Sequence, residues 1–169
     1  FLKAVRLGTE WAQKQQVVTL GIQPTHPATG YGYIEVARES NGNGKTNAEL
    51  HAYKTLGFRE KPNEQTAEEF IASGNFFWNA GMFIFEVATM IALFEKHQKT
   101  LWAQFRRLNP DLSNLAEIYK AIESISIDYA IMEKASESLR VIPADVGWSD
   151  VGSWDAVSDL SRRFPVEND

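Results

Sequence analysis

Apolar residues recur along this chain at two spacings, and each spacing predicts a different kind of element. Between residues 2 and 15 they return every three or four positions, which predicts a helix. Residues 17–22 form a continuous apolar run rich in β-branched side chains, which is typical of a strand covered on both faces. Two prolines and a glycine within residues 23–30 exclude regular structure, so a loop is expected at the end of that strand.

A hairpin and a short helix are predicted next. Residues 31–37 and 49–58 have strand-like patterns, and the Gly- and Asn-rich residues 40–44 between them predict a turn. Residues 66–73 have a helical pattern that opens after a set of capping residues, beginning with Asn63, and closes at Gly74.

The second half of the chain is predicted to be mainly helical. Residues 79–86 form an apolar strand pattern that changes into a helix over 87–97. Further helices are expected at 101–108, 115–122 and 128–134, followed by a strand at 139–144 and a helix at 152–160. This order suits an α/β fold of three layers with a mixed sheet, as one domain spanning residues 1–169.

The predicted sheet lacks a strand before its opening helix. A sheet of this kind normally has central strands on both sides of an apolar strand such as 17–22. The pattern therefore predicts an exposed apolar sheet edge at this strand. Because an unpaired edge invites association, we expect the chain either to form a homodimer or to aggregate.

Composition narrows the class of protein. A chain of 169 residues with 44% hydrophobic and 23% charged residues can form an ordinary hydrophobic core. The net charge of -5 includes no run of Lys or Arg, which argues against binding to nucleic acid or to a membrane surface. The absence of cysteine excludes thiolate catalysis and fits a cytoplasmic location. Because the first residue is Phe1, we expect the chain to continue upstream.

Asp150 is the first candidate for chemistry. It lies in the segment DVGWSDVGSW, residues 145–154, between a predicted strand and a predicted helix. Ligands in open α/β sheets bind at such turns, and the flanking glycines allow close approach of the backbone to a ligand or a metal ion. The structural alternative is that Asp150 only caps the following helix.

Three other segments contain polar or glycine residues at the ends of predicted strands. Glu60 and Lys61 precede a proline, where a lysine can hold a phosphate and a glutamate can accept from sugar hydroxyls. Asn79 and Gly81 stand at the start of an apolar strand, where an amide can bind a sugar or a glycine can permit a bulge. Gly32 either allows a ligand to approach the backbone or shapes a turn.

Several other chemistries have no support in the sequence. The segment from Ser126 to Asp128 is interpreted only as the start of a helix. The histidines are scattered without HExxH spacing, and no GxSxG elbow occurs, which argues against metallohydrolase and serine-hydrolase activity. No GxGxxG or GxxxxGK[ST] loop is present to hold a phosphate chain.

Five segments together resemble one enzyme family. The segments are TGYGYIE (29–35), FREKP (58–62), WNAGMFIF (78–85), SIDYA (126–130) and GWSDVGSW (147–154). In their order and spacing they resemble mannose-1-phosphate guanylyltransferases, the GDP-mannose pyrophosphorylases. The resemblance implies a Rossmann-like nucleotidyltransferase fold, here without its N-terminal part, and the transfer of GMP from GTP to mannose 1-phosphate with release of pyrophosphate.

The resemblance also implies roles for individual residues. Asp150 matches the aspartate that binds Mg²⁺ and takes part in catalysis. Lys61 matches a catalytic lysine on the sugar phosphate, and Glu60 matches a residue on the sugar hydroxyls. Asn79, Gly81 and Gly32 match positions that contact the sugar. The glycine-rich GxGxR-type signature that holds the triphosphate of GTP in this family has no counterpart in the sequence.

We therefore interpret the chain as the sugar-phosphate half of such a catalytic domain, inactive by itself. Two alternatives stay open. One is another sugar-1-phosphate nucleotidyltransferase, because EKP and an aspartate before glycine recur in that superfamily. The other is a module that binds a sugar phosphate without catalysis.

Overall fold

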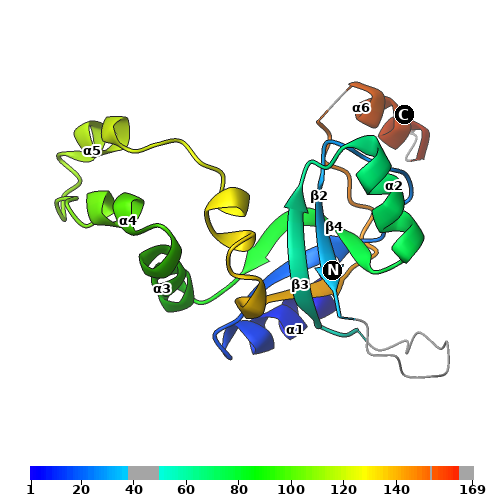
Figure 1. Ribbon diagram of the computed structural model, residues 1–169, viewed down its shortest axis with the longest axis horizontal. Coiled ribbons are helices and arrows are strands. Elements are labelled where there is room, and N and C mark those ends of the chain that lie inside the picture. The colour runs from blue at the N-terminus through cyan, green and yellow to red at the C-terminus, as the bar shows by residue number, and fades with distance from the viewer. Residues whose placement is uncertain (38–49, 153, 164–169) are drawn as a thin grey trace, which may run out of the picture.

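The computed structural model describes residues 1–37, 50–152 and 154–163 (Figure 1). The turn predicted at 40–44 lies outside the described residues. No helix in the described part of the chain is long and apolar enough to cross a membrane. The helices are α1 (Leu2–Ala12), α2 (Glu64–Ser73), α3 (Val87–His97), α4 (Lys99–Phe105), α5 (Leu115–Ala121), α6 (Trp154–Arg163) and the short η1 (Asp128–Met132) and η2 (Ser136–Ser138); the strands are β1 (Val17–Ile22), β2 (Gly32–Val36), β3 (Tyr53–Glu60), β4 (Phe76–Ile84) and β5 (Leu139–Pro143).

The five strands form a small closed barrel in the order β1-β4-β2-β3-β5. The β1 and β5 strands run parallel, whereas the other neighbours in the barrel are antiparallel. The mixed sheet and the hairpin of β2 and β3 are therefore confirmed. The open sheet of a three-layer fold is not observed, because β3 pairs with β5 and closes the sheet on itself.

The prediction of an exposed edge at β1 is wrong. This strand pairs with β4 on one side and with β5 on the other, so its backbone groups are hydrogen-bonded on both sides. Closure of a sheet removes its edges, which is one way in which proteins avoid edge-to-edge association. The expectation of association was based on an unpaired edge at β1, and this edge is absent from the described sheet.

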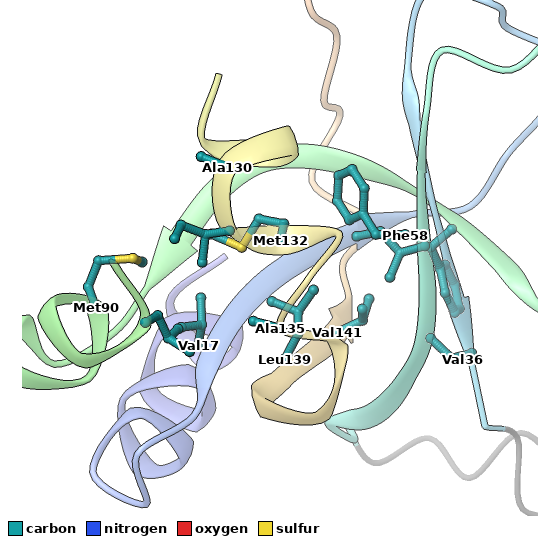
Figure 2. Close-up of a cluster of buried hydrophobic side chains, with 13 residues drawn as sticks. Val17, Val36, Phe58, Met90, Ala130, Met132, Ala135, Leu139 and Val141 are labelled. Atoms are coloured by element: carbon teal, nitrogen blue, oxygen red, sulfur yellow. The ribbon is translucent and has the colours of Figure 1, made fainter. Parts of the chain in front are cut away.

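The main hydrophobic core fills the barrel and the space beneath η1 (Figure 2). Val17 of β1, Phe58 of β3 and Val141 of β5 are each 1% exposed or less. Ala130 and Met132 of η1 point into the same cluster and anchor this short helix on the barrel. Burial of a side chain of the size of Met132, the last residue of η1, contributes about 1.5–3 kcal/mol and holds this short helix on the barrel.

Two further clusters attach the helices. Ala4 of α1 packs with Val18, Leu20 and Ile142, so α1 lies on the barrel wall formed by β1 and β5. Ala67 of α2 packs with Tyr33, Phe76 and Trp78. The α2 helix begins at Glu64, earlier than the predicted 66, because Asn63, the first of the expected capping residues, accepts a hydrogen bond from the Thr66 amide at 2.8 Å. It ends as predicted, before Gly74, which has φ 70°.

The segment from α3 to α5 departs from a layered arrangement. Figure 1 shows these helices as an arm that extends away from the barrel and returns through a long connection to η1. The helix predicted at 128–134 is a π-helical turn over Asp128–Met132. Such turns are rare in proteins, and those that occur are often at functional sites.

The β4 strand starts earlier than predicted and contains a bulge. It begins at Phe76, so Asn79 lies within the strand. Thr19 faces Phe83 while Gly21 faces Asn79, which leaves extra residues on β4 around Gly81. Gly81 has φ 70°, a left-handed conformation that favours glycine. The bulge that the sequence left open as an alternative is therefore present.

Candidate functional site

Gly32, Glu60 and Lys61 come together at one end of the β2-β3 hairpin. Gly32 and Glu60 are direct partners across the two strands. The Glu60 side chain is only 13% exposed, and its carboxylate lies 3.8 Å from the Lys61 ammonium, which is itself 62% exposed. Lys61 has φ 49°, an uncommon conformation for a residue with a side chain. The hairpin thus presents a largely covered carboxylate beside an accessible cation.

Gly32 controls where the Glu60 carboxylate can lie. A Cβ atom at position 32 would stand 2.6 Å from Glu60 Oε2 and 3.1 Å from Phe58 Cζ. A glycine is therefore required for the carboxylate to remain in its present position. Burial of the Glu60 carboxyl raises its pKa. The negative charge of Asp128 raises this pKa further, whereas the positive charge of Lys61 lowers it.

Gly32→Ala is expected to push the Glu60 carboxylate into solvent and so to lower the Glu60 pKa toward its ordinary value. The end of the side chain can move, so the variant should still fold. The Glu60 pKa can be measured by NMR titration of its carboxyl carbon. Gly30→Ala is the matched control, because nothing lies within 4 Å of a Cβ at that position. An unchanged Glu60 pKa in Gly32→Ala would contradict the steric role.

Asn79 lies at the centre of a second group of polar contacts. Its Oδ1 accepts hydrogen bonds from the Thr19 hydroxyl at 2.9 Å and from the Gly81 amide at 3.2 Å. Its Nδ2 donates to Asp128 Oδ1 at 3.2 Å. The side chain therefore closes the bulge of β4 and also connects β1 and β4 to η1.

Asp128 joins this second group to the hairpin group. Burial raises the pKa of its carboxyl, while the hydrogen bond from Asn79 and the charge of Lys61 lower it. Glu60 and Asp128 are close enough for the charge of Asp128 to raise the Glu60 pKa. Two partly buried carboxylates, one cation and one amide thus form a single polar cluster over the barrel.

Asp150 lies apart from this cluster, on the segment between β5 and α6. Its Oδ1 accepts hydrogen bonds from the Tyr31 hydroxyl and from the Gly152 amide, each at 3.2 Å. The α6 helix begins only at Trp154, so the contact with Gly152 closes a turn before the helix. A Cβ at Gly152 would lie 2.8 Å from Asp150 Oδ2, so the glycine leaves room for the carboxylate.

Tyr31 connects the two parts of the site. Its carbonyl oxygen accepts from the Lys61 amide at 3.2 Å, while its hydroxyl donates to Asp150. Its ring makes edge-on contacts with Trp78 and Trp148, with ring centroids 5.1 and 5.4 Å away. Burial, together with the charge of Asp150 and the hydrogen bond to it, raises the pKa of the Tyr31 hydroxyl, which therefore remains a donor at neutral pH.

A cavity of about 560 Å³ opens beside the Asp150 segment. It lies at the carboxyl ends of the parallel strands β1 and β5, where ligands bind in α/β sheets. Its lining comes from β1 and the residues after it (Gly21, Ile22, Gln23, Thr25), from β4 (Phe77, Trp78) and from the segment after β5 (Pro143, Ala144, Asp145, Val146, Gly147, Trp148).

The donor set around Asp150 fits a partial magnesium site. Mg²⁺ prefers oxygen ligands, keeps several waters, and is often held by one or two carboxylates together with substrate phosphates. Asp150 is exposed and supplies one such carboxylate. Among the described residues, no three acidic or histidine side chains gather into a metal-binding group. The remaining ligands would have to come from phosphates, water and other parts of the protein.

The sequence indicated most of these residues but not the ones that join them. Tyr31 and Asp128 lie within recognised segments, yet neither was singled out, because a tyrosine beside glycine and an aspartate at a helix start have ordinary structural explanations. Ser126 does help to start η1, since its hydroxyl oxygen accepts from the Tyr129 amide at 3.4 Å. Thr19 was missed because it stands within an apolar strand, where it is fully buried.

Comparison with known protein families places the chain in one of them. Residues 1–165 match the model of the nucleotidyl transferase family, and the chain belongs to that family. The resemblance found in the sequence is thereby confirmed at the level of the family.

The relatives narrow the comparison to mannose-1-phosphate guanylyltransferases. The chain is 36% identical to the mannose-1-phosphate guanylyltransferase of Escherichia coli strain K12 over 175 aligned residues, which cover 99% of this chain and 36% of that protein. It is 41% identical to the enzyme of the same name from Sinorhizobium fredii, with 93% of this chain and 30% of that one covered. The chain therefore spans about a third of the length of these relatives.

Two solved structures are similar to this chain in fold and in sequence. A structure described as mannose-1-phosphate geranyltransferase from Thermus thermophilus is 37% identical, with a TM-score of 0.77 over 94% of this chain and 44% of that chain. A structure described as mannose-6-phosphate isomerase from Helicobacter pylori is 28% identical, with a TM-score of 0.70 over 88% of this chain and 57% of that one.

Proposed function

We propose that this chain is the sugar-phosphate half of a mannose-1-phosphate guanylyltransferase, which transfers GMP from GTP to mannose 1-phosphate and releases pyrophosphate. The observation that carries the proposal is the junction at Tyr31. Through its backbone and its hydroxyl, this residue joins the Glu60-Lys61 hairpin to Asp150. The residues proposed for the sugar phosphate and the carboxylate proposed for the metal are therefore connected through one residue.

The proposed reaction needs orientation and charge neutralisation more than covalent chemistry by the protein. A phosphate oxygen of mannose 1-phosphate attacks the α-phosphorus of GTP, and the bond from that phosphorus to pyrophosphate breaks. Catalysis of such transfers depends on placing the two substrates in line and stabilising the charge on the phosphate oxygens. The exposed Lys61 ammonium suits the sugar phosphate, because a lysine binds phosphate as a point charge.

Each part of the polar cluster has a place in this proposal. Glu60 accepts hydrogen bonds from sugar hydroxyls, Asn79 donates one, and Gly32 and Gly81 allow the sugar to approach the backbone. Asp150 holds Mg²⁺, which neutralises charge on the phosphates. The triphosphate of GTP binds mainly to a glycine-rich segment outside this chain, so the complete enzyme means this chain together with that segment.

Lys61→Ala in the complete enzyme is expected to raise the KM for mannose 1-phosphate about 10- to 100-fold and to change the KM for GTP much less. A hydrogen bond to a charged group contributes about 1.5–3 kcal/mol, which corresponds to that range. Steady-state kinetics with each substrate varied in turn measures both constants.

Lys96→Ala is the control for this measurement. Lys96 is also an exposed lysine in an ion pair, 2.8 Å from Glu137, but it lies on the arm in α3. The control should leave both constants unchanged. Equal increases in both constants for Lys61→Ala would show that this lysine does not bind the sugar phosphate selectively.

The choice of sugar and nucleotide can be tested separately. The complete enzyme should form GDP-mannose from GTP and mannose 1-phosphate faster than any product from other pairs of nucleotide and sugar 1-phosphate. A preference for another pair would agree with the proposed type of reaction but contradict the proposed substrates. Binding of sugar phosphate without turnover of any pair would favour the non-catalytic module.

A further inference from the structure

The side-chain amide of Asn79 can be oriented in only one way. The Gly81 backbone N–H is a donor and cannot accept, so the atom that it meets at 3.2 Å must be the amide oxygen of Asn79. The opposite end of the amide then faces Asp128 at 3.2 Å, and an ionised carboxylate accepts hydrogen bonds only. In the flipped amide, two donors would meet at Gly81 and two acceptors would meet at Asp128.

The same contacts define what Asn79 can offer to a ligand. Its oxygen has two lone pairs, and these accept from Thr19 and from Gly81. Its NH₂ group has two hydrogens, of which one is donated to Asp128. Within the described contacts, one N–H therefore remains, and Asn79 can act toward a ligand only as a donor.

Asp128 is held rigidly enough to impose this orientation. It is the first residue of η1, and the following residues Ala130, Ile131 and Met132 are each 1% exposed or less. Figure 2 shows Ala130 and Met132 directed into the core cluster. The helix start therefore cannot shift without disturbing the core. Asn79 stands on the bulge of β4, a separate element, so the contact with Asp128 joins two elements that are far apart in sequence.

We propose that Asp128 is a positioning residue that fixes the Asn79 amide, so that its remaining N–H always points to an acceptor oxygen of the sugar. This inference rests on the proposed function only in naming the sugar as the ligand. The positioning itself concerns residues of this chain alone. It can therefore be tested without turnover.

The first test is NMR spectroscopy of the ¹⁵N-labelled 169-residue chain. The Asn79 side-chain signals are identified by their loss in Asn79→Ser. In the unmodified chain, the proton donated to Asp128 should be well separated in chemical shift from the other amide proton. In Asp128→Ala, the two shifts should move toward those of exposed asparagines. Unchanged signals in that variant would overturn the proposal.

Two further variants separate positioning from folding. Asp128→Asn keeps an acceptor oxygen for Asn79 and should retain the separated signals, even if the loss of charge changes stability. Glu133→Gln removes an exposed carboxylate that also lies near Glu60, immediately after η1, and should leave the Asn79 signals unchanged. If Glu133→Gln shifted them as much as Asp128→Ala, the effect would be a general one of local charge and the proposal would fail.

The second test is a double-mutant cycle in the complete enzyme. Asn79→Ala and Asp128→Ala should each raise the KM for mannose 1-phosphate about tenfold, the double variant should be no worse than the single ones, and Asp128→Asn should recover most of the loss. Additive effects of the two substitutions would overturn the proposal. If Asn79→Ala left this KM unchanged while the NMR result held, the assigned sugar contact would fail and the positioning would stand.

Discussion

Asp150→Asn in the complete enzyme is expected to lower the rate of pyrophosphate release by at least about 100-fold. The asparagine keeps the shape of the side chain and can still accept from Tyr31, but it loses the charge that a hard divalent cation requires. Even groups that only orient a metal ligand change affinity or activity by about 10- to 100-fold when they are removed. The loss should be largest at low Mg²⁺ concentration.

The control for Asp150→Asn is the same substitution at Asp111. Asp111 is another exposed aspartate whose carboxylate closes a local turn, accepting from the Ser113 amide at 3.0 Å, but it lies on the arm. This variant should retain full activity, and both variants should keep the circular dichroism spectrum of the parent. Full activity of Asp150→Asn at limiting Mg²⁺ would exclude Asp150 as a metal ligand.

The 169-residue chain without any added segment is expected to release no pyrophosphate from GTP and mannose 1-phosphate above the uncatalysed rate. Its sequence contains no GxGxR-type signature to hold a triphosphate, and among the described residues no three acidic or histidine side chains form a metal-binding group. Orientation and charge neutralisation provide nearly all of the acceleration in phosphoryl transfer, so a half-site should not be enough.

A complementation experiment supplies the matched comparison. The glycine-rich segment of a relative, joined to this chain or added as a separate chain, should restore formation of GDP-mannose that depends on Mg²⁺. The same segment with Asp150→Asn in this chain should not restore it. Turnover by the 169-residue chain alone would show that the triphosphate site lies within these residues, against the proposal.

Much of the local structure could be predicted from spacing alone. The β1 and β5 strands, the α2 helix with its Asn63 cap and its end at Gly74, and the hairpin of β2 and β3 follow from hydrophobic period and capping chemistry. The helix and its caps depend on residues within about one turn of each other, each strand depends on its own residues, and the hairpin joins two strands that follow each other along the chain. The recognised segments likewise identified Glu60, Lys61 and Asp150 as candidates.

The closure of the barrel could not be predicted in this way. It depends on pairing of Tyr53 and Lys54 in β3 with Val141 and Arg140 in β5. A strand pattern shows that a segment will pair and which side chains face the core, but it does not identify the neighbouring strand. The expectation of an exposed β1 edge was wrong for this reason.

The candidate site shows the same difference between what the sequence predicts and what depends on contacts between distant residues. The residue types and their order show which side chains are available: a lysine and a glutamate at a strand end, an amide close to a glycine, and a carboxylate between glycines. The contacts of Tyr31 with Lys61 and Asp150, and the hydrogen bond from the Asn79 amide to Asp128, are seen only in the folded chain. The contacts Tyr31–Asp150 and Asn79–Asp128 join residues 119 and 49 positions apart, and hydrogen bonds require donor and acceptor within about 3 Å, a condition that only the folded chain can meet.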